Sequence, residues 1–368
     1  MYNWQLSDWP NFTFEKSKIK DQLLLFVQDS GRLNGWLEAI PSDSRNEAML
    51  EIMLSEAINT SEIEGEFLSR EDVMSSIKRN LGLSPSIKEV KDLRAQGIAE
   101  LVLAVRNTFD EPLTKETIFA WHQMIMKGNV RINTGQWRFH DEPMQVVSGA
   151  IGREVVHFEA PPSDIVPKEM EAFIRWFNNT APGGSLEISN PSFRAAIAHL
   201  YFETIHPFED GNGRIGRAIA EKALSQSLGH PVFLSLSRTI LRDRKAYYEA
   251  LKKGQKSNDI TEWINYFQDV IMASQQAAHQ QIKFLLKKTK YLDLHRSGLN
   301  ERQLKVILRI LKEGPDGFEG GITAKKYMAI SKTSKATATR DLQDMVSKKM
   351  IRANDTKGRS TAYMLVFE

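Results

Sequence analysis

The sequence has no cysteine among its 368 residues. Disulfide bridges, thiolate nucleophiles and cysteine-bound zinc are therefore excluded, as is usual for proteins of a reducing compartment. No stretch approaches the roughly 18 apolar residues that a membrane-spanning helix needs. The first ten residues also have no basic flank or apolar run of the kind found in signal peptides. We therefore expect a cytoplasmic protein that has no membrane partner.

A large excess of charge of either sign is also missing, because the formal net charge is only +3. With 41% hydrophobic and 26% charged residues, the composition is that of a folded protein. The chain is longer than the roughly 100 to 200 residues of a typical domain, so two or three domains are expected. The cationic excess lies at the end, where residues 297–368 hold 14 Lys and Arg against 8 Asp and Glu.

Apolar residues recur at helical spacing through most of the chain, which predicts a mainly α fold. The exception is the segment 144–159, where two β-rich runs flank Ser148, Gly149 and Gly152 and predict a β-hairpin. The charged, apolar-poor segment 287–300 is the predicted domain boundary. The predicted helices cover about 22–37, 46–63, 88–109, 115–126, 167–179, 191–205, 212–228, 240–253 and 260–290.

Residues 206–217 read HPFEDGNGRIGR and precede or open a predicted helix. Gly211 and Gly213 have no side chain, so the amides at the helix N-terminus can close on an anion such as phosphate. Arg214 and Arg217 share one helix face at a spacing that suits successive phosphates. Asn212 can donate a hydrogen bond to another phosphate oxygen. The segment therefore predicts a polyphosphate site.

Two further residues of this segment supply chemistry. Asp210 is a hard oxygen ligand beside the predicted phosphates, which suits Mg²⁺. His206 has an ordinary pKa of about 6.5 and can accept a proton near neutrality. A single histidine or Gly-x-Gly is more often structural, but packing does not explain all of these residues within twelve positions.

The segment resembles the Fic family signature HPFx(D/E)GNGRxxR at every specified position. The resemblance implies a Fic-type helical core with a β-hairpin flap, and transfer of AMP from ATP to a Ser, Thr or Tyr hydroxyl of a protein. It implies His206 as the base and Asp210 as the holder of Mg²⁺. The phosphate roles that it implies are α and β for Gly211, Asn212 and Gly213, β for Arg214, and γ for Arg217.

The resemblance extends to residues outside the signature. The predicted hairpin lies where the family has its flap, so Val155, Val156, His157 and Phe158 are expected to hold a target segment by strand addition and to cover the nucleotide. The alternative is an ordinary edge hairpin. Tyr247, Tyr248 and Gln255 resemble residues on the adenine side, although a tyrosine pair on an amphipathic helix is more often part of a core.

Residues 60–65 read TSEIEG and match the family's inhibitory pattern (S/T)xxxE(G/N). Glu64, at the end of a predicted helix, is expected to pair with Arg217 and to remove the guanidinium that orients the γ-phosphate. The alternative is a solvated glutamate before a glycine that ends the helix. Some family members also use this glutamate to remove AMP, and the sequence leaves that open.

The N-terminal stretch YNWQLSDWPNF resembles the domain that precedes the Fic core in many bacterial members. The predicted organisation is an N-terminal helical domain (1–90), a catalytic core (91–290) and a C-terminal domain (297–368) that resembles a winged helix-turn-helix. A winged helix implies DNA contact, whereas protein docking or homodimer formation is the alternative. The DNA-facing residues would be Ser334, Lys335, Thr337 and Arg340, with Lys357 and Arg359 on phosphates.

Two alternatives to AMP transfer stay open. In one, the chain is a transcriptional regulator that senses nucleotide through the Fic core and acts through the winged helix. In the other, the same phosphate site transfers a different group, such as UMP or phosphocholine. The target protein is unspecified, and the chain itself is one candidate.

Overall fold

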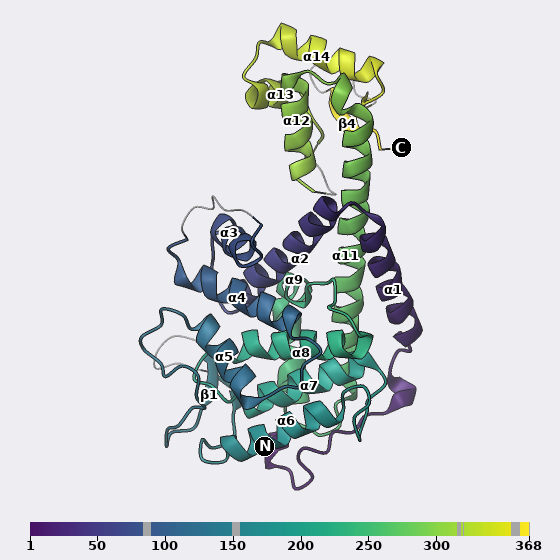
Figure 1. Ribbon diagram of the computed structural model, residues 1–368. Coiled ribbons are helices and arrows are strands. Elements are labelled where there is room, and N and C mark those ends of the chain that lie inside the picture. Colours follow the sequence, from purple (N-terminus) through teal and green to yellow (C-terminus); the bar gives the residue numbers. More distant parts are fainter. Residues whose placement is uncertain (84–89, 149–154, 315–317, 319, 355–360, 368) are drawn as a thin grey trace. The chain divides into compact units, whose positions relative to one another are not determined.

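The structure is a computed structural model that describes residues 1–83, 90–148, 155–314, 318, 320–354 and 361–367 (Figure 1). The predicted hairpin glycines Gly149 and Gly152, and the predicted phosphate contacts Lys357 and Arg359, lie outside the described residues. Contacts divide the chain into two units. Unit 1 comprises 1–34 with 49–278, and unit 2 comprises 35–48 with 279–368. Each unit is described by itself.

The described chain is mostly helical, with two short antiparallel sheets. None of its described helices is both long enough and apolar enough to cross a lipid bilayer. The helices are α1 (Leu23–Ala39), α2 (Ser42–Ile63), α3 (Arg70–Asn80), α4 (Leu93–Asn107), α5 (Lys115–Ile125), α6 (Val166–Asn179), α7 (Pro191–Ile205), α8 (Asn212–Leu228), α9 (Leu236–Arg242), α10 (Arg244–Gly254), α11 (Thr261–His295), α12 (Glu301–Lys312), α13 (Ala324–Ser331) and α14 (Lys335–Ser347). The strands are β1 (Gln145–Ser148), β2 (Val155–Glu159), β3 (Ile351–Ala353) and β4 (Tyr363–Leu365).

Three parts of the helix prediction differ from the structure. Helix α3 has no predicted counterpart. The single helix predicted over 240–253 is two helices, because Asp243 ends α9 and its side chain caps α10 by accepting from the Ala246 amide at 3.0 Å. Helix α11 continues to His295 through the predicted boundary segment, because apolar residues such as Tyr291 bury one side of it in unit 2.

Helices α7 and α8 form the centre of unit 1. Every residue of α7 except Phe193 is buried, and its alanines and those of α8 let the two backbones approach closely. Asn190 caps α7 by accepting from the amides of Ser192 and Phe193, and Pro191 occupies the first turn. The loop 206–211 therefore connects two helices that the core holds in place.

The N-terminal segment packs against this core. The indole of Trp9 meets the ring of Tyr201 edge to face at 5.2 Å, and the Asn3 amide donates to the Gln255 carbonyl at 2.9 Å. The indole N–H of Trp4 donates to the carbonyl of Glu159 at 2.8 Å. The first residues thus contact both the core and the end of β2.

Strands β1 and β2 form the predicted hairpin, with a register shift between Val146 and Val147. Val155 and Val156 are exposed, whereas Phe158 is buried with its ring 5.0 Å from that of Tyr2. The hairpin is therefore anchored at the Glu159 end. Its exposed valines leave β2 with an apolar surface.

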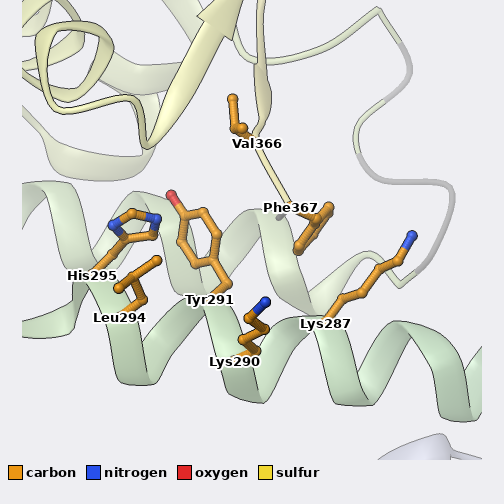
Figure 2. A pocket seen from close by; sticks show the side chains of 7 residues that line it. All are labelled: Lys287, Lys290, Tyr291, Leu294, His295, Val366 and Phe367. Atoms are coloured by element: carbon orange, nitrogen blue, oxygen red, sulfur yellow. The ribbon is translucent and has the colours of Figure 1, made fainter.

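Unit 2 has its own core, formed by α11, α12, α13, α14 and β3, with β4 packed against it. Figure 2 shows Tyr291 of α11 facing Phe367, with ring centroids 5.8 Å apart. The Tyr291 hydroxyl donates to the Met350 carbonyl at 3.0 Å. The assignment of this unit as a winged helix stays a prediction.

Candidate functional site

The loop 206–211 ends on an α8 N-terminus that no side chain caps. Gly211 has φ +88°, and a Cβ there would lie 2.6 Å from Cε of Met126, so only glycine fits. The side chain of Asn212 closes the loop, because it accepts from the Phe208 amide at 3.0 Å and donates to the Phe208 carbonyl at 2.8 Å. Asn212 thereby shapes the loop, and the amides of the first turn face an anion-binding position.

Arg217 is almost fully buried in the first turns of α8, with its side chain 1% exposed. Its Nη2 donates to Oε1 of Glu64 at 2.8 Å and to the carbonyl of Thr60 at 2.9 Å. Its Nε donates to Oγ1 of Thr60 at 2.8 Å. Burial works against the charge, but Glu64 holds the pKa of Arg217 above its ordinary value. The end of α2 is thus joined to the predicted γ-phosphate arginine.

The Glu64 carboxylate lies directly over Gly213. A Cβ built on Gly213 would be 2.2 Å from Oε1 of Glu64 and 3.1 Å from Nη1 of Arg217. The carboxylate therefore occupies the space at the N-terminus of α8 that the missing glycine side chain leaves open. The carboxylate of Glu64 thus takes the position where the sequence predicts that an anion binds.

Arg214 is also buried, and it pairs with a residue that sequence reasoning missed. Its Nη1 donates to Oε2 of Glu66 at 2.7 Å, and its Nη2 lies 3.7 Å from Oδ1 of Asp210. The only sequence signal for this pair is the repeat of glutamate two positions after Glu64. Both predicted phosphate arginines therefore contact carboxylates from one short segment.

His206 follows the last turn of α7 in a left-handed conformation, with φ +50°. Its carbonyl accepts from Nε of Arg138 at 2.7 Å, and Arg138 also contacts the carbonyl of Pro161 after the hairpin. Burial, followed by the charge of Arg138, lowers the pKa of His206 to about 4. The ring is therefore neutral at pH 7 and has a lone pair that can accept a proton.

Glu203 lies on α7 one turn before His206, with Oε2 3.9 Å from Nδ1 of His206. Its side chain is only 5% exposed, and Oε1 has no hydrogen-bond partner in the described chain. Burial, followed by the charge of Glu64, raises the pKa of Glu203 to about 8. Glu203 is thus a neutral acid beside His206, and sequence reasoning missed it.

The predicted adenine-side residues have different environments. Tyr247 is buried, and its hydroxyl pairs with Nε2 of His199 at 2.8 Å. Gln255 is also buried and donates to the Glu203 carbonyl at 3.2 Å. Tyr248 is partly exposed, and its hydroxyl donates to the Ile63 carbonyl at 3.4 Å. Tyr248 therefore contacts the end of α2.

Comparison with known proteins identifies the central part of the chain. Residues 112–224, which include the loop and most of α8, match the model described as "Fic/DOC family". This part of the chain is therefore similar to the Fic/DOC family. Residues 2–83 match a "Domain of unknown function (DUF4172)". Glu64 and Glu66 therefore lie in a segment that matches a different family model from the loop and α8.

Curated relatives that carry the name protein adenylyltransferase include a bacterial and an animal protein. The chain is 26% identical over 220 residues to "Probable protein adenylyltransferase aq_aa38" of Aquifex aeolicus, covering 56% of this chain and 59% of the relative. It is 26% identical over 256 residues to "Protein adenylyltransferase Fic" of Nematostella vectensis, covering 68% of this chain and 54% of the relative. The chain thus spans somewhat over half the length of these relatives.

Solved structures with the same fold include a Fic family protein from Desulfovibrio desulfuricans G20. It has a TM-score of 0.54 and 20% identity, with 98% of each chain covered. A Fic domain containing signaling protein from Bacteroides thetaiotaomicron has a TM-score of 0.54 and 21% identity, with 70% of this chain and 97% of that chain covered. These likenesses confirm the predicted Fic-type helical fold with its hairpin.

The buried polar atoms around the loop 206–211 fit a polyphosphate, and the carboxylate of Asp210 suits Mg²⁺. Nε of Arg214, Nη1 of Arg217 and Nε2 of His122 are buried without a hydrogen-bond partner in the described chain. Buried donors of this kind normally have partners, so an anion between them would complete the site. Asp210 is half-exposed, and the described residues contain no cluster of three metal-binding side chains. Mg²⁺ suits such a site, since it takes one or two carboxylates together with phosphates and water.

Proposed function

We propose that this protein transfers AMP from ATP to a Ser, Thr or Tyr hydroxyl of a target protein, itself included, and that Glu64 inhibits the transfer. The names of the curated relatives support adenylyl transfer as the reaction class. The observation that carries the proposal is the contact of Glu64 with Arg217 over Gly213, at 2.8 Å. A carboxylate held at the N-terminus of α8 marks the position where a phosphate would bind.

In this proposal the loop and α8 bind the polyphosphate. The amides of Gly211 and Gly213 approach the α- and β-phosphates, while Asn212 keeps the loop in shape through Phe208. Arg214 and Arg217 provide guanidinium groups for the β- and γ-phosphates. Because both arginines are buried, their attraction for phosphate is less screened by water than on an open surface.

His206 is the proposed general base. The target hydroxyl gives its proton to the neutral imidazole while its oxygen attacks the α-phosphorus of ATP. The bond between the α-phosphorus and the α,β-bridging oxygen breaks, and pyrophosphate leaves. The low pKa of His206 applies without nucleotide; a polyphosphate beside the ring would stabilise the imidazolium and raise that pKa toward neutrality.

Asp210 is the proposed holder of Mg²⁺, and it accepts from the Gly211 amide at 2.6 Å. Mg²⁺, when bound, would neutralise negative charge on the phosphates during transfer. The residues of the hairpin are the proposed contact for the target. The exposed Val155 and Val156 provide an apolar strand surface that an extended peptide can join.

Glu64 inhibits in this proposal by occupying Arg217. With the guanidinium engaged, the γ-phosphate has no partner to orient it, and the α-phosphorus is not presented in line with the attacking oxygen. The carboxylate also repels a polyphosphate at close range. Removal of Glu64 is therefore expected to increase transfer.

The test uses purified wild-type chain and the variants Glu64→Gly and His206→Ala, incubated with Mg²⁺ and ATP labelled on the α-phosphate. Glu71→Gly is the matched control, because Glu71 is an exposed glutamate in the first turn of α3. We expect strong labelling of protein by Glu64→Gly, and weak labelling by the wild type and by Glu71→Gly. His206→Ala should give none.

Labelled UTP in a parallel reaction tests transfer of a different nucleotide. Labelling from UTP but not from ATP would replace AMP transfer by UMP transfer. If Glu64→Gly labels nothing from either nucleotide, with or without cell lysate, the proposal of nucleotidyl transfer fails.

A second function, DNA contact through unit 2, is favoured by the surface of α14. A hollow on its exposed side is lined by Lys335, Ala336, Thr339, Arg340 and Gln343. The acidic residues of α14 face other partners, since Asp341 accepts from Arg302 at 2.9 Å and Asp344 from Lys348 at 2.8 Å. The outward side of α14 is therefore cationic, as a helix that enters a major groove requires.

Fluorescence anisotropy with mixed genomic DNA fragments tests this second function at several salt concentrations. Binding that weakens steeply with salt, and that Lys335→Ala with Arg340→Ala abolishes, would support DNA contact. Equal binding by the wild type and the double variant would remove α14 from the proposal. Homodimer formation through the same unit stays a prediction.

A further inference from the structure

Arg214 has a carboxylate partner of its own, distinct from the partner of Arg217. The Nη1 atom of Arg214 donates to Oε2 of Glu66 at 2.7 Å, while its side chain is only 3% exposed. Glu66 keeps 29% of its side chain exposed. A buried cation is therefore paired with an anion that is in contact with solvent. Glu66 can thus move away and be replaced by another anion.

One turn presents both carboxylates. The carbonyl of Ser61 accepts from the amide of Glu64 at 3.1 Å and from the amide of Glu66 at 2.9 Å. Gly65 lies between them with φ +83°, a conformation that L-residues with a side chain rarely adopt. The left-handed residue reverses the chain after α2, so that Glu64 and Glu66 reach Arg217 and Arg214 from the same side.

We infer that Glu66 is a second inhibitory carboxylate, which masks Arg214 while Glu64 masks Arg217. The inference rests on the proposed function. It differs from inhibition by Glu64 alone because the masked group is the arginine expected to bind the β-phosphate. A diphosphate nucleotide must then displace Glu66 even though it has no γ-phosphate.

The surroundings of Arg214 support this role. Arg214 also has Asp210 nearby, with Oδ1 of Asp210 3.7 Å from Nη2 of Arg214. The Nε atom of Arg214 has no hydrogen-bond partner in the described chain. A phosphate group has more acceptor oxygens than the single carboxylate oxygen that Arg214 now contacts, and its hydrogen bonds with arginine are strong. The β-phosphate is thus a better partner for Arg214 than Glu66. The free energy needed to displace Glu66 reduces the net gain in nucleotide binding, and a variant without this carboxylate avoids that cost.

A purely structural role for Glu66 predicts a different outcome. If Glu66 only holds the guanidinium in place, its removal will loosen Arg214 and weaken nucleotide binding. If Glu66 competes with phosphate, its removal will strengthen the binding of ADP. The direction of the change in ADP affinity therefore separates the two roles.

The experiment measures ADP and AMP binding by isothermal titration calorimetry, with Mg²⁺ present, for the full chain and the variants Glu66→Gln and Glu71→Gln. We expect Glu66→Gln to bind ADP about tenfold more tightly than the wild type, which corresponds to about 1.4 kcal/mol. AMP, which has no β-phosphate, should bind equally to both. Glu71→Gln should match the wild type for ADP and AMP.

Glu66→Asp is a second variant for the case in which Glu66→Gln does not fold. It keeps the charge but shortens the side chain by one methylene, and its ADP affinity should lie between those of the wild type and Glu66→Gln. Unchanged or weaker ADP binding by the folded variants would overturn the inference.

Failure of the proposed function is recognised separately, because the binding assay needs no transfer. If Glu64→Gly transfers label but Glu66 variants bind ADP like the wild type, only the second carboxylate is refuted. In the Glu64→Gly background, adding Glu66→Gln should lower the KM for ATP about tenfold and change kcat less. An unchanged KM there would also count against Glu66.

Discussion

The guanidinium of Arg138 donates from Nε to the main-chain carbonyl of His206 at 2.7 Å. The same group donates from Nη1 to Oγ of Ser163 at 2.8 Å and from Nη2 to the carbonyl of Ile205 at 3.4 Å. Arg138 thus fixes the left-handed turn that carries the proposed base. Burial lowers the pKa of Arg138 to about 10, so the group remains charged at pH 7.

Replacing Arg138 is expected to reduce AMP transfer without touching the nucleotide site. In the Glu64→Gly background, Arg138→Gln should lower kcat about 100-fold, since a displacement of about 1 Å at the base costs that much. The measurement is the rate of label transfer beside ATP affinity, which should change little. Arg131→Gln, at an exposed arginine, is the control. Equal kcat for the two variants would contradict a positioning role.

Thr60 is expected to contribute to inhibition through its hydroxyl, which accepts from Nε of Arg217 at 2.8 Å. Thr60→Val keeps the shape of this buried side chain but leaves that N–H without a partner. Hydrogen bonds to charged groups contribute about 1.5–3 kcal/mol, so the inhibited state should lose part of its stability. Label transfer should rise above the wild-type rate and stay below that of Glu64→Gly. A rate equal to the wild type would show that Thr60 has no part in inhibition.

Gly213 is expected to tolerate no side chain. In Gly213→Ala the new Cβ would lie 2.2 Å from Oε1 of Glu64, so the carboxylate must move away from Arg217. The methyl group would then fill the space proposed for phosphate. We therefore expect lower thermal stability and no activation, and Gly213→Ala should also abolish transfer in the Glu64→Gly background. Active Gly213→Ala would place the phosphates elsewhere.

The buried acid Glu203 should make stability depend on pH. Its pKa is raised from 4.5 to about 8 by burial and by Glu64. Between these two values the unfolded chain has lost the proton and the folded chain keeps it, so the free energy of unfolding falls as pH rises, by up to about 1.4 kcal/mol per pH unit. Below pH 4.5 the contribution is fully present.

Glu203→Gln removes this titration. Relative to the wild type, the variant should gain stability steadily from pH 5 to pH 8, as measured by urea unfolding at each pH. Parallel pH profiles for the two proteins would mean that Glu203 is ionised in the folded state.

In unit 2, Asp341 is expected to be the main polar support of the core. Burial opposes its ionisation, yet hydrogen bonds from Arg302, Tyr327 and Asn300 hold its pKa below the ordinary value. This contribution is present above pH 3.8 and is lost as pH falls through the folded pKa. Asp341→Asn should lower the free energy of unfolding by about 1–3 kcal/mol. Asp344→Asn, at a more exposed position, is the control, and an equal loss there would contradict the prediction.

The sequence predicted the helices around the loop well because their ends carry local signals. Asn190 and Pro191 mark the start of α7, and Gly211 and Gly229 border α8. The split at Asp243 was missed because the apolar spacing continues from α9 into α10. Helix α3 was missed although Ser69 caps it, because its charged sequence has a weak apolar stripe.

The site was predictable where a motif specifies it and unpredictable where partners meet only through the fold. The pairing of Glu64 with Arg217 followed from two short patterns. Arg138, Glu203 and Glu66 carry no such pattern, and Glu66 lies 148 residues from Arg214 in the sequence. The burial of Tyr247 and Gln255 depends on their packing behind α7, which spacing along one helix does not reveal.

The carbonyl of Ser61, which accepts hydrogen bonds from two amides, bears on the equilibrium between the closed and open states of the turn. Because one carbonyl accepts from the amides of both Glu64 and Glu66, we expect the turn to open and close as a unit. Under the proposed function, the basal activity of the wild-type chain would then measure the small population of molecules in which this turn is open. Any partner that changes the opening free energy by about 1.4 kcal/mol resets that population tenfold, with no change in the chemistry of the site.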